Sequence, residues 1–128
     1  MLLIDPGAEA ERLAARLASN ALHAPEHLLV EVTNVLRRHR NAGRLSEAEA
    51  NLARAGLATL AIEYWPFEVL AERSWQLGGN VTSYDAAYVA LAERLGVALL
   101  TADARLARAT GPTCAIELFA IAPRATPA

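Results

Sequence analysis

Three acidic residues stand where an isolated negative charge is hard to accommodate. Glu31 follows Leu28 by three residues and precedes Val35 by four, so it borders the apolar stripe of a predicted helix. Asp85 falls in the first turn of another predicted helix, also beside its apolar face. Asp103 comes just after an apolar strand, and the ligand crevice of an open α/β sheet lies beyond the carboxyl ends of its strands. The three acids are therefore candidates for one site.

A divalent cation is the partner that this set of acids favours. A charge at the border of a core needs a partner, and the chain has no lysine, because all twelve basic residues are arginine. Mg²⁺ prefers oxygen ligands and would satisfy the three carboxylates together. A metal held in this way lowers the pKa of a bound water and orients that water towards a phosphodiester. The hydroxyls of Thr101 and Ser83 are placed to support the ligands.

Each acid also has an ordinary structural interpretation. Asp85 could serve only as a first-turn acid favoured by the helix dipole. Asp103 could be a turn or N-cap residue, and Glu31 could pair with Arg38. Their joint occurrence favours the metal site over the three separate explanations.

Composition excludes several classes of protein. Without lysine, the chain cannot be a Schiff-base enzyme or a P-loop nucleotidase. Its single cysteine, Cys114, can form neither an internal disulfide nor a thiolate cage, which fits a reducing compartment and a role in the core. No run approaches the roughly 18 apolar residues of a membrane span, and no signal pattern opens the chain. We therefore expect a cytoplasmic protein.

Periodicity and capping signals predict short strands that alternate with helices. Ser46 and Glu49 form a capping box, Leu52 should face inward in the helix that follows, and Tyr84 should begin the buried stripe of a later helix. The pattern favours a three-layer α/β/α domain with a central, mainly parallel sheet over residues 1–122, and a disordered tail at 123–128. The predicted helices cover residues 8–18, 26–40, 46–60, 67–77, 84–95 and 104–109, and the predicted strands cover 21–24, 61–65 and 97–101.

Two stretches of the chain resemble a known family. The segment from Ser83 to Gly96, followed by Leu99-Leu100-Thr101-Ala102-Asp103, looks like the C-terminal signature of PIN-domain ribonucleases of the VapC toxin group. The earlier stretch from His23-Ala24-Pro25 to Arg38 is similar to the second acidic motif of that family. Together they cover most of the chain, in the family's order.

The resemblance implies an endoribonuclease toxin that depends on Mg²⁺ or Mn²⁺. It also implies a homodimer that cleaves RNA and is held inactive by a cognate antitoxin protein. Glu31, Asp85 and Asp103 fall on three of the family's acidic positions, Asn34 falls on a polar position beside the site, and Thr101 lies two residues before the last acid.

The fourth acid of the family has no clear counterpart. Met1-Leu2-Leu3-Ile4 imitates the family's first strand and Asp5 its acid, but Pro6-Gly7 does not fit the motif. We expect Met1 to Ile4 to match the end of the family's first helix and Asp5 to be a turn residue. On this interpretation the chain lacks the family's first strand and its metal-binding aspartate. If Asp5 instead takes part in the site, it is the one candidate for a fourth acid.

Arginines near the acids are candidates for RNA contacts. Arg37 and Arg38 follow Glu31, and Arg105 follows Asp103, so their guanidinium groups could bind phosphates. Solvated helix ends explain them as well. Trp65 and Trp75 fit packing or interface anchors better than base-stacking platforms.

Two functions from different classes remain open. The first is an active toxin ribonuclease with Glu31, Asp85 and Asp103 as catalytic and metal-binding residues. The alternative is a degenerate, inactive PIN domain that acts as a binding or dimerisation module.

Overall fold

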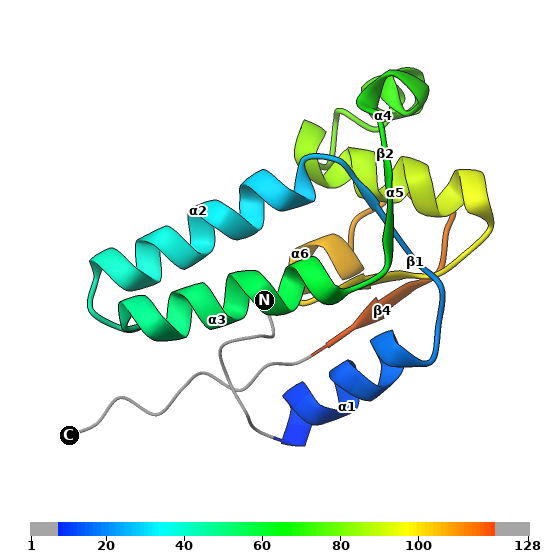
Figure 1. The fold of residues 1–128 in the computed structure, drawn as a ribbon. Helices are drawn as coiled ribbons and strands as arrows, with labels where there is room; N and C mark the ends of the chain where they lie inside the picture. Colours follow the sequence, from blue (N-terminus) through cyan, green and yellow to red (C-terminus); the bar gives the residue numbers. More distant parts are fainter. Residues whose placement is uncertain (1–7, 120–128) are drawn as a thin grey trace. The chain divides into compact units, whose positions relative to one another are not determined.

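The computed structural model describes residues 8–119, with side chains from residue 11 onward, in two compact units (Figure 1). The first unit holds residues up to 22 and 27–63, and the second holds 23–26 and the chain from 64 onward. Asp5 and the tail at 123–128 lie outside the described residues. The sequence predicts that residues 1–122 form one domain. This would include both units, and it stays a prediction.

The first unit is built from three helices. They are α1 (Ala8–Ala18), α2 (Leu28–Asn41) and α3 (Glu47–Thr59), and α2 packs against α3 (Figure 1). The capping box at the start of α3 is confirmed, because Ser46 Oγ accepts from Glu49 N at 3.0 Å and Glu49 Oε1 accepts from Ser46 N at 3.0 Å. The buried core of this helix pair consists of Val32, Leu36, Leu45, Ala50, Ala53 and Leu57.

The predicted inward position of Leu52 is wrong. Its side chain is 75 % exposed. The buried positions of α3 are Ala50, Ala53 and Leu57, and a residue directly before Ala53 is turned by about 100° from that stripe. The apolar face of α3 is therefore lined largely by alanine, which permits close approach of α2.

The second unit carries most of the short strands and the central helix α5. Its elements are η1 (Phe67–Val69), α4 (Ala71–Gln76), α5 (Ser83–Leu95), β3 (Leu99–Thr101), α6 (Ala104–Ala107) and β4 (Ile116–Leu118). Helix α5 packs against α4 and β3, and six of its residues are buried. Gly96 ends the helix with φ +65°, a left-handed conformation that glycine adopts without strain.

The predicted burial of Tyr84 is also wrong, because this residue is 67 % exposed. The packed part of α5 begins two residues later, at Ala86 and Ala87, which are fully buried. The other residues of the predicted buried stripe do face the core. Leu91 is buried, and Tyr88 and Leu95 are partly buried against core clusters.

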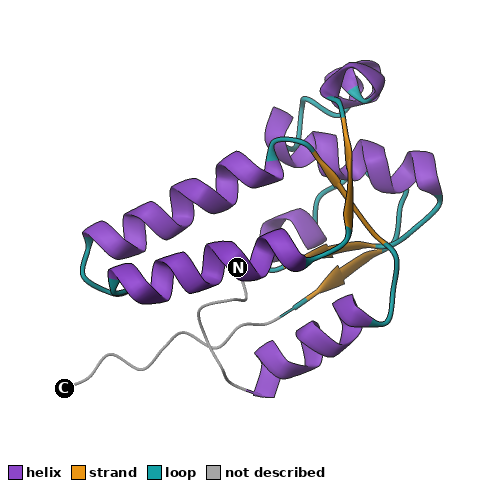
Figure 2. Cartoon of the chain, viewed as in Figure 1, coloured by secondary structure: helices purple, strands orange, loops and turns teal. Residues whose placement is uncertain are grey.

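The described strands pair in two two-stranded sheets (Figure 2). Strand β1 (Leu22–Pro25) pairs with β2 (Ile62–Trp65). Strand β3 pairs in parallel with β4, with Leu99 opposite Ile116 and Thr101 opposite Leu118. The parallel pairing agrees with the expected sheet, whereas β4 itself was not predicted. No helix within residues 8–119 has the length and apolarity of a membrane span.

An ion pair connects three segments of the second unit. Arg73 on α4 donates from Nε to Glu93 Oε1 of α5 at 2.6 Å and from Nη2 to Glu93 Oε2 at 3.0 Å. Arg73 Nη2 also donates to Gly111 O at 3.1 Å, and Thr113 N donates to Glu93 Oε2 at 3.1 Å. Because the loop of Gly111 and Thr113 leads into β4, the pair ties α4 and α5 to the strand that supports β3.

The electrostatics of this network follow from its hydrogen bonds. The Arg73 guanidinium holds the pKa of Glu93 below its ordinary value, and Glu93 in turn raises the pKa of Arg73. Cys114, next to Thr113, packs against the core cluster of α5 and β3, and burial raises the pKa of its thiol. The predicted role of Cys114 as a core residue is confirmed.

We expect Arg73→Met to destabilise the fold by roughly 1–2 kcal/mol, because it leaves the Glu93 carboxylate without its charged partner. The Arg73 side chain is 35 % exposed, so solvent screening keeps the loss below that of a fully buried pair. Urea unfolding measures the change, with Arg54→Met on the exposed face of α3 as the control. Equal stability of the two variants would contradict this role for Arg73.

The same pair predicts a pH dependence. Because the folded-state pKa of Glu93 is lowered, its stabilising contribution is complete above the ordinary pKa of 4.5 and is lost as the pH falls through the folded value. The free energy of unfolding should therefore fall less between about pH 5 and pH 3 in Glu93→Gln than in the unmodified chain. If the free energy of unfolding falls equally with pH in the two proteins, the Glu93 carboxylate does not contribute to the pH dependence of stability.

Candidate functional site

Asp85 is fixed at the N-terminal end of α5. The N-cap residue Thr82 is extended, and its Oγ1 accepts a hydrogen bond from Asp85 N at 3.2 Å. The cap therefore engages the backbone of Asp85 and not its carboxylate. Asp85 is partly buried, Ser83 beside it is exposed, and the carboxylate lies where the helix dipole favours a negative charge.

Asp103 caps α6, so its predicted N-cap role is confirmed. Its Oδ1 accepts from Arg105 N at 2.9 Å. Its own N–H donates to Thr101 Oγ1 at 3.0 Å, so the Thr101 hydroxyl orients the backbone that carries the acid. A carboxylate has about four lone-pair sites, and a capping aspartate can therefore still bind a cation.

Glu31 lies in the first turn of α2, in the first unit. Its Oε1 is 2.9 Å from His27 Nε2, one helical turn earlier. A contact with His27 was not predicted, although the spacing of four residues could have revealed it, because residues four apart share one helix face. Asn34 is exposed on the same helix.

The three acids are divided between the two units. Asp85 and Asp103 belong to the second unit, where α5 packs on β3 and α6 follows β3. Glu31 belongs to the first unit. In the chain from 8 to 119, no group of three or more His, Cys, Asp or Glu side chains is arranged to hold a metal ion. The donors themselves are carboxylate oxygens, the ligand type that suits Mg²⁺ or Mn²⁺.

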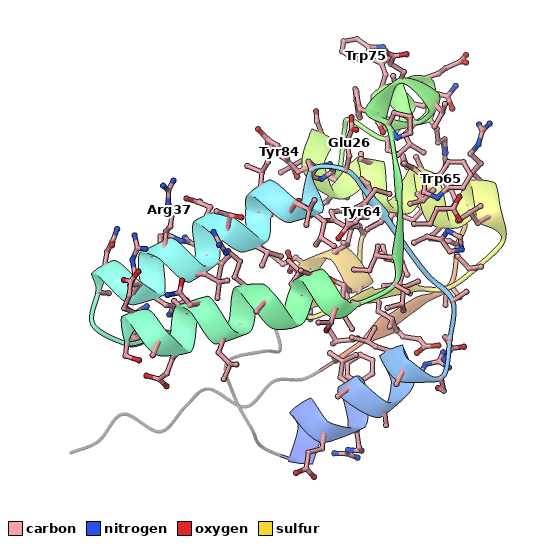
Figure 3. The ribbon with its side chains drawn as sticks, viewed as in Figure 1. Glu26, Arg37, Tyr64, Trp65, Trp75 and Tyr84 are labelled. Carbon is pink, nitrogen blue, oxygen red and sulfur yellow. The ribbon has the colours of Figure 1, made fainter. Side chains whose placement is uncertain are left out.

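The arginines near these acids are mainly exposed. Arg37 projects from α2 (Figure 3), and Arg38 is also exposed. The Arg105 side chain is 90 % exposed, with its Nε 3.7 Å from Asp103 Oδ1. All three guanidinium groups are therefore accessible to solvent.

The two tryptophans differ in their environment (Figure 3). Trp65 is partly buried and donates from Nε1 to His23 Nδ1 at 3.2 Å, as expected of a packing residue. Trp75 is 88 % exposed on α4. Of the two predicted roles, an interface anchor is the one that its exposure favours.

Comparison with known proteins covers nearly the whole chain. The model of the PIN domain family matches residues 2–112. Ribonuclease VapC12 of Mycobacterium tuberculosis is 38 % identical over 120 residues, which are 94 % of this chain and 92 % of the relative. Ribonuclease VapC1 of the same species is 44 % identical over 117 residues, or 91 % and 88 % of the two chains. VapC ribonuclease Mb0985 of Mycobacterium bovis is 38 % identical over 102 residues, or 80 % of each chain.

The family model spans Glu31, Asp85 and Asp103. They confirm the expected α/β fold of the PIN type and the resemblance seen in the two motifs. The chain belongs to the PIN-domain family, among relatives that are VapC ribonucleases.

Proposed function

We propose that this protein is an endoribonuclease toxin of a toxin–antitoxin pair. The observation that carries the proposal is the family match over residues 2–112, together with relatives of 38–44 % identity that are named ribonucleases. Glu31, Asp85 and Asp103 are the residues of this chain that would act on the RNA phosphodiester.

The three carboxylates would hold Mg²⁺ or Mn²⁺. When bound, such a cation activates a water and neutralises the charge that develops on the phosphate. The chain's own groups prepare this site. Thr82 fixes the backbone of Asp85 at 3.2 Å, and Thr101 fixes that of Asp103 at 3.0 Å. Ser83 lies near Asp85 in the sequence and Asn34 lies near Glu31. Their polar side chains would support the metal-binding carboxylates.

The exposed arginines would hold the substrate. Arg37 and Arg38 on α2 and Arg105 on α6 offer planar guanidinium groups, which bind phosphates through paired hydrogen bonds. Such contacts are insensitive to base sequence and set affinity and orientation. The net charge of −2 leaves these local clusters as the source of attraction for RNA.

We further propose a cytoplasmic homodimer that is inhibited by a cognate antitoxin protein. Trp75 on α4 is 88 % exposed, and Phe67 and Val69 of the preceding η1 are also exposed. Because aromatic residues are enriched at protein interfaces, these exposed side chains support the proposal of an interface in the second unit.

An inactive PIN module is the competing function. It is favoured by the absence of a gathered metal-binding group within residues 8–119. Asp5, the candidate fourth acid, lies outside the described part of the chain. Direct measurement of RNA cleavage separates the two functions.

Asp85→Asn should lower metal-dependent RNA cleavage by about 100-fold or more, because loss even of a group that orients a ligand costs 10–100-fold. The fold should persist, since the capping bond uses the backbone N–H of residue 85. Gel analysis of a labelled RNA with Mg²⁺ measures the loss, and circular dichroism checks the fold.

Glu72→Gln is the matched control for this experiment. Glu72 is an exposed acid of α4 in the same unit, and its replacement removes the same charge. We expect it to cleave at the rate of the unmodified chain. Undiminished cleavage by pure, folded Asp85→Asn would overturn the proposed role of Asp85.

A further inference from the structure

Tyr84 exposes an aromatic ring at the start of a helix face that is buried further along the helix. Its side chain is 67 % exposed at the N-terminal end of α5 (Figure 3). Ala87 and Leu91, three and seven residues later, share this face of α5 and are buried. The core cluster on this face joins Leu70 to Ala87, Ala90 and Leu91, and its first member on α5 is Ala87. The core-facing stripe of α5 therefore begins one turn before the core that covers it.

The exposed ring stands directly beside a candidate site acid. Asp85 is the next residue, and its N–H donates to Thr82 Oγ1 at 3.2 Å, so the cap holds the backbone of the turn that carries both side chains. The base and the phosphate of a nucleotide are joined through one sugar. An RNA whose phosphodiester lies at Asp85 therefore has its flanking bases within reach of the same turn.

The charges of this segment favour an aromatic contact with RNA over a contact with phosphate. Residues 80–92 contain no arginine, and the whole chain has no lysine. Asp85 is the one charged residue in that segment, and a carboxylate repels a phosphate. Stacking of a base on an aromatic ring needs no charge and tolerates every base, because each base has a π-face. A tyrosine can therefore attract RNA where the segment offers no cation.

We propose that Tyr84 is a substrate-binding residue that stacks on an unpaired RNA base beside the phosphodiester at Asp85. The inference rests on the proposed function, because it names a substrate contact of the same site. It commits to single-stranded RNA, whose unstacked bases are available to aromatic side chains. The contact strengthens binding of the substrate without selecting one base.

A protein partner is the alternative cover for the ring, since aromatic residues are enriched at protein interfaces. The two occupants respond to different changes. Contact with a second copy of the chain makes self-association depend on Tyr84 and leaves RNA affinity unchanged. Contact with RNA depends on the bases of the ligand, so it is lost when an oligonucleotide keeps its phosphates and lacks its bases.

The test is the steady-state cleavage of a labelled single-stranded RNA with Mg²⁺. We expect Tyr84→Ala to raise KM about tenfold with kcat nearly unchanged, because stacking binds the substrate and its transition state alike. Tyr84→Phe keeps an aromatic ring and should restore most of the affinity. An abasic oligonucleotide of the same length, used as a competitive inhibitor, should inhibit Tyr84→Ala and the unmodified chain with equal inhibition constants.

Val97→Ala is the matched control, since Val97 is another exposed apolar residue of the second unit. It should keep the KM of the unmodified chain. Melting temperatures and the mass measured by sedimentation should be the same for Tyr84→Ala and the unmodified chain, because the ring is mostly exposed.

Three results would overturn the role of Tyr84. They are an unchanged KM in Tyr84→Ala, an equal rise of KM in Tyr84→Phe, and a weaker inhibition of Tyr84→Ala by the abasic oligonucleotide. A changed mass with an unchanged KM assigns the ring to a protein contact instead.

The unmodified chain separates this inference from the proposed function in the same assay. If it cleaves RNA and Tyr84→Ala has the same KM, only the inference about Tyr84 fails. If the unmodified chain cleaves no RNA, the proposed function and the role of Tyr84 fail together.

Discussion

The bidentate contact between Arg73 and Glu93 is the interaction that joins the separate segments of the second unit. Helix α4 is only six residues long and β4 only three, so neither is stable without contacts to the rest of the unit. The Arg73 guanidinium connects α4 to α5 and to the carbonyl of Gly111, and Glu93 also accepts from Thr113. The network thereby holds the loop that leads into β4, the strand that pairs with β3.

Both candidate site acids of the second unit, Asp85 and Asp103, lie at helix N-termini. Thr82 caps α5 just before Asp85, and Asp103 is itself the cap of α6. Local capping chemistry therefore sets the backbone at each acid independently of the distant parts of the chain. This arrangement explains how a unit with very short strands can still hold these two residues in defined backbone positions.

Features fixed by neighbouring residues could be predicted from the sequence, and features that need distant partners could not. The capping box at Ser46, the glycine end of α5 and the N-cap role of Asp103 each depend on a few adjacent residues. Strand β4 was missed because three residues carry no clear pattern and it forms only by pairing with β3. The apolar character of Leu52 and Tyr84 predicts that both face inward, but alanines make up much of the buried face of both helices and these two larger side chains lie outside it. Whether Glu31 meets Asp85 and Asp103 is again a long-range question, and that convergence stays a prediction.

We propose that this PIN-domain protein cleaves RNA with a divalent cation held by its carboxylates. The most direct measurement treats the purified, unmodified chain with a chelator, removes the chelator, and follows cleavage of a labelled RNA as Mg²⁺ or Mn²⁺ is added. We expect no cleavage without metal and saturable recovery as either cation is restored. Cleavage that persists in the metal-free protein, or no cleavage at any metal concentration, would contradict a role for the cation in this protein.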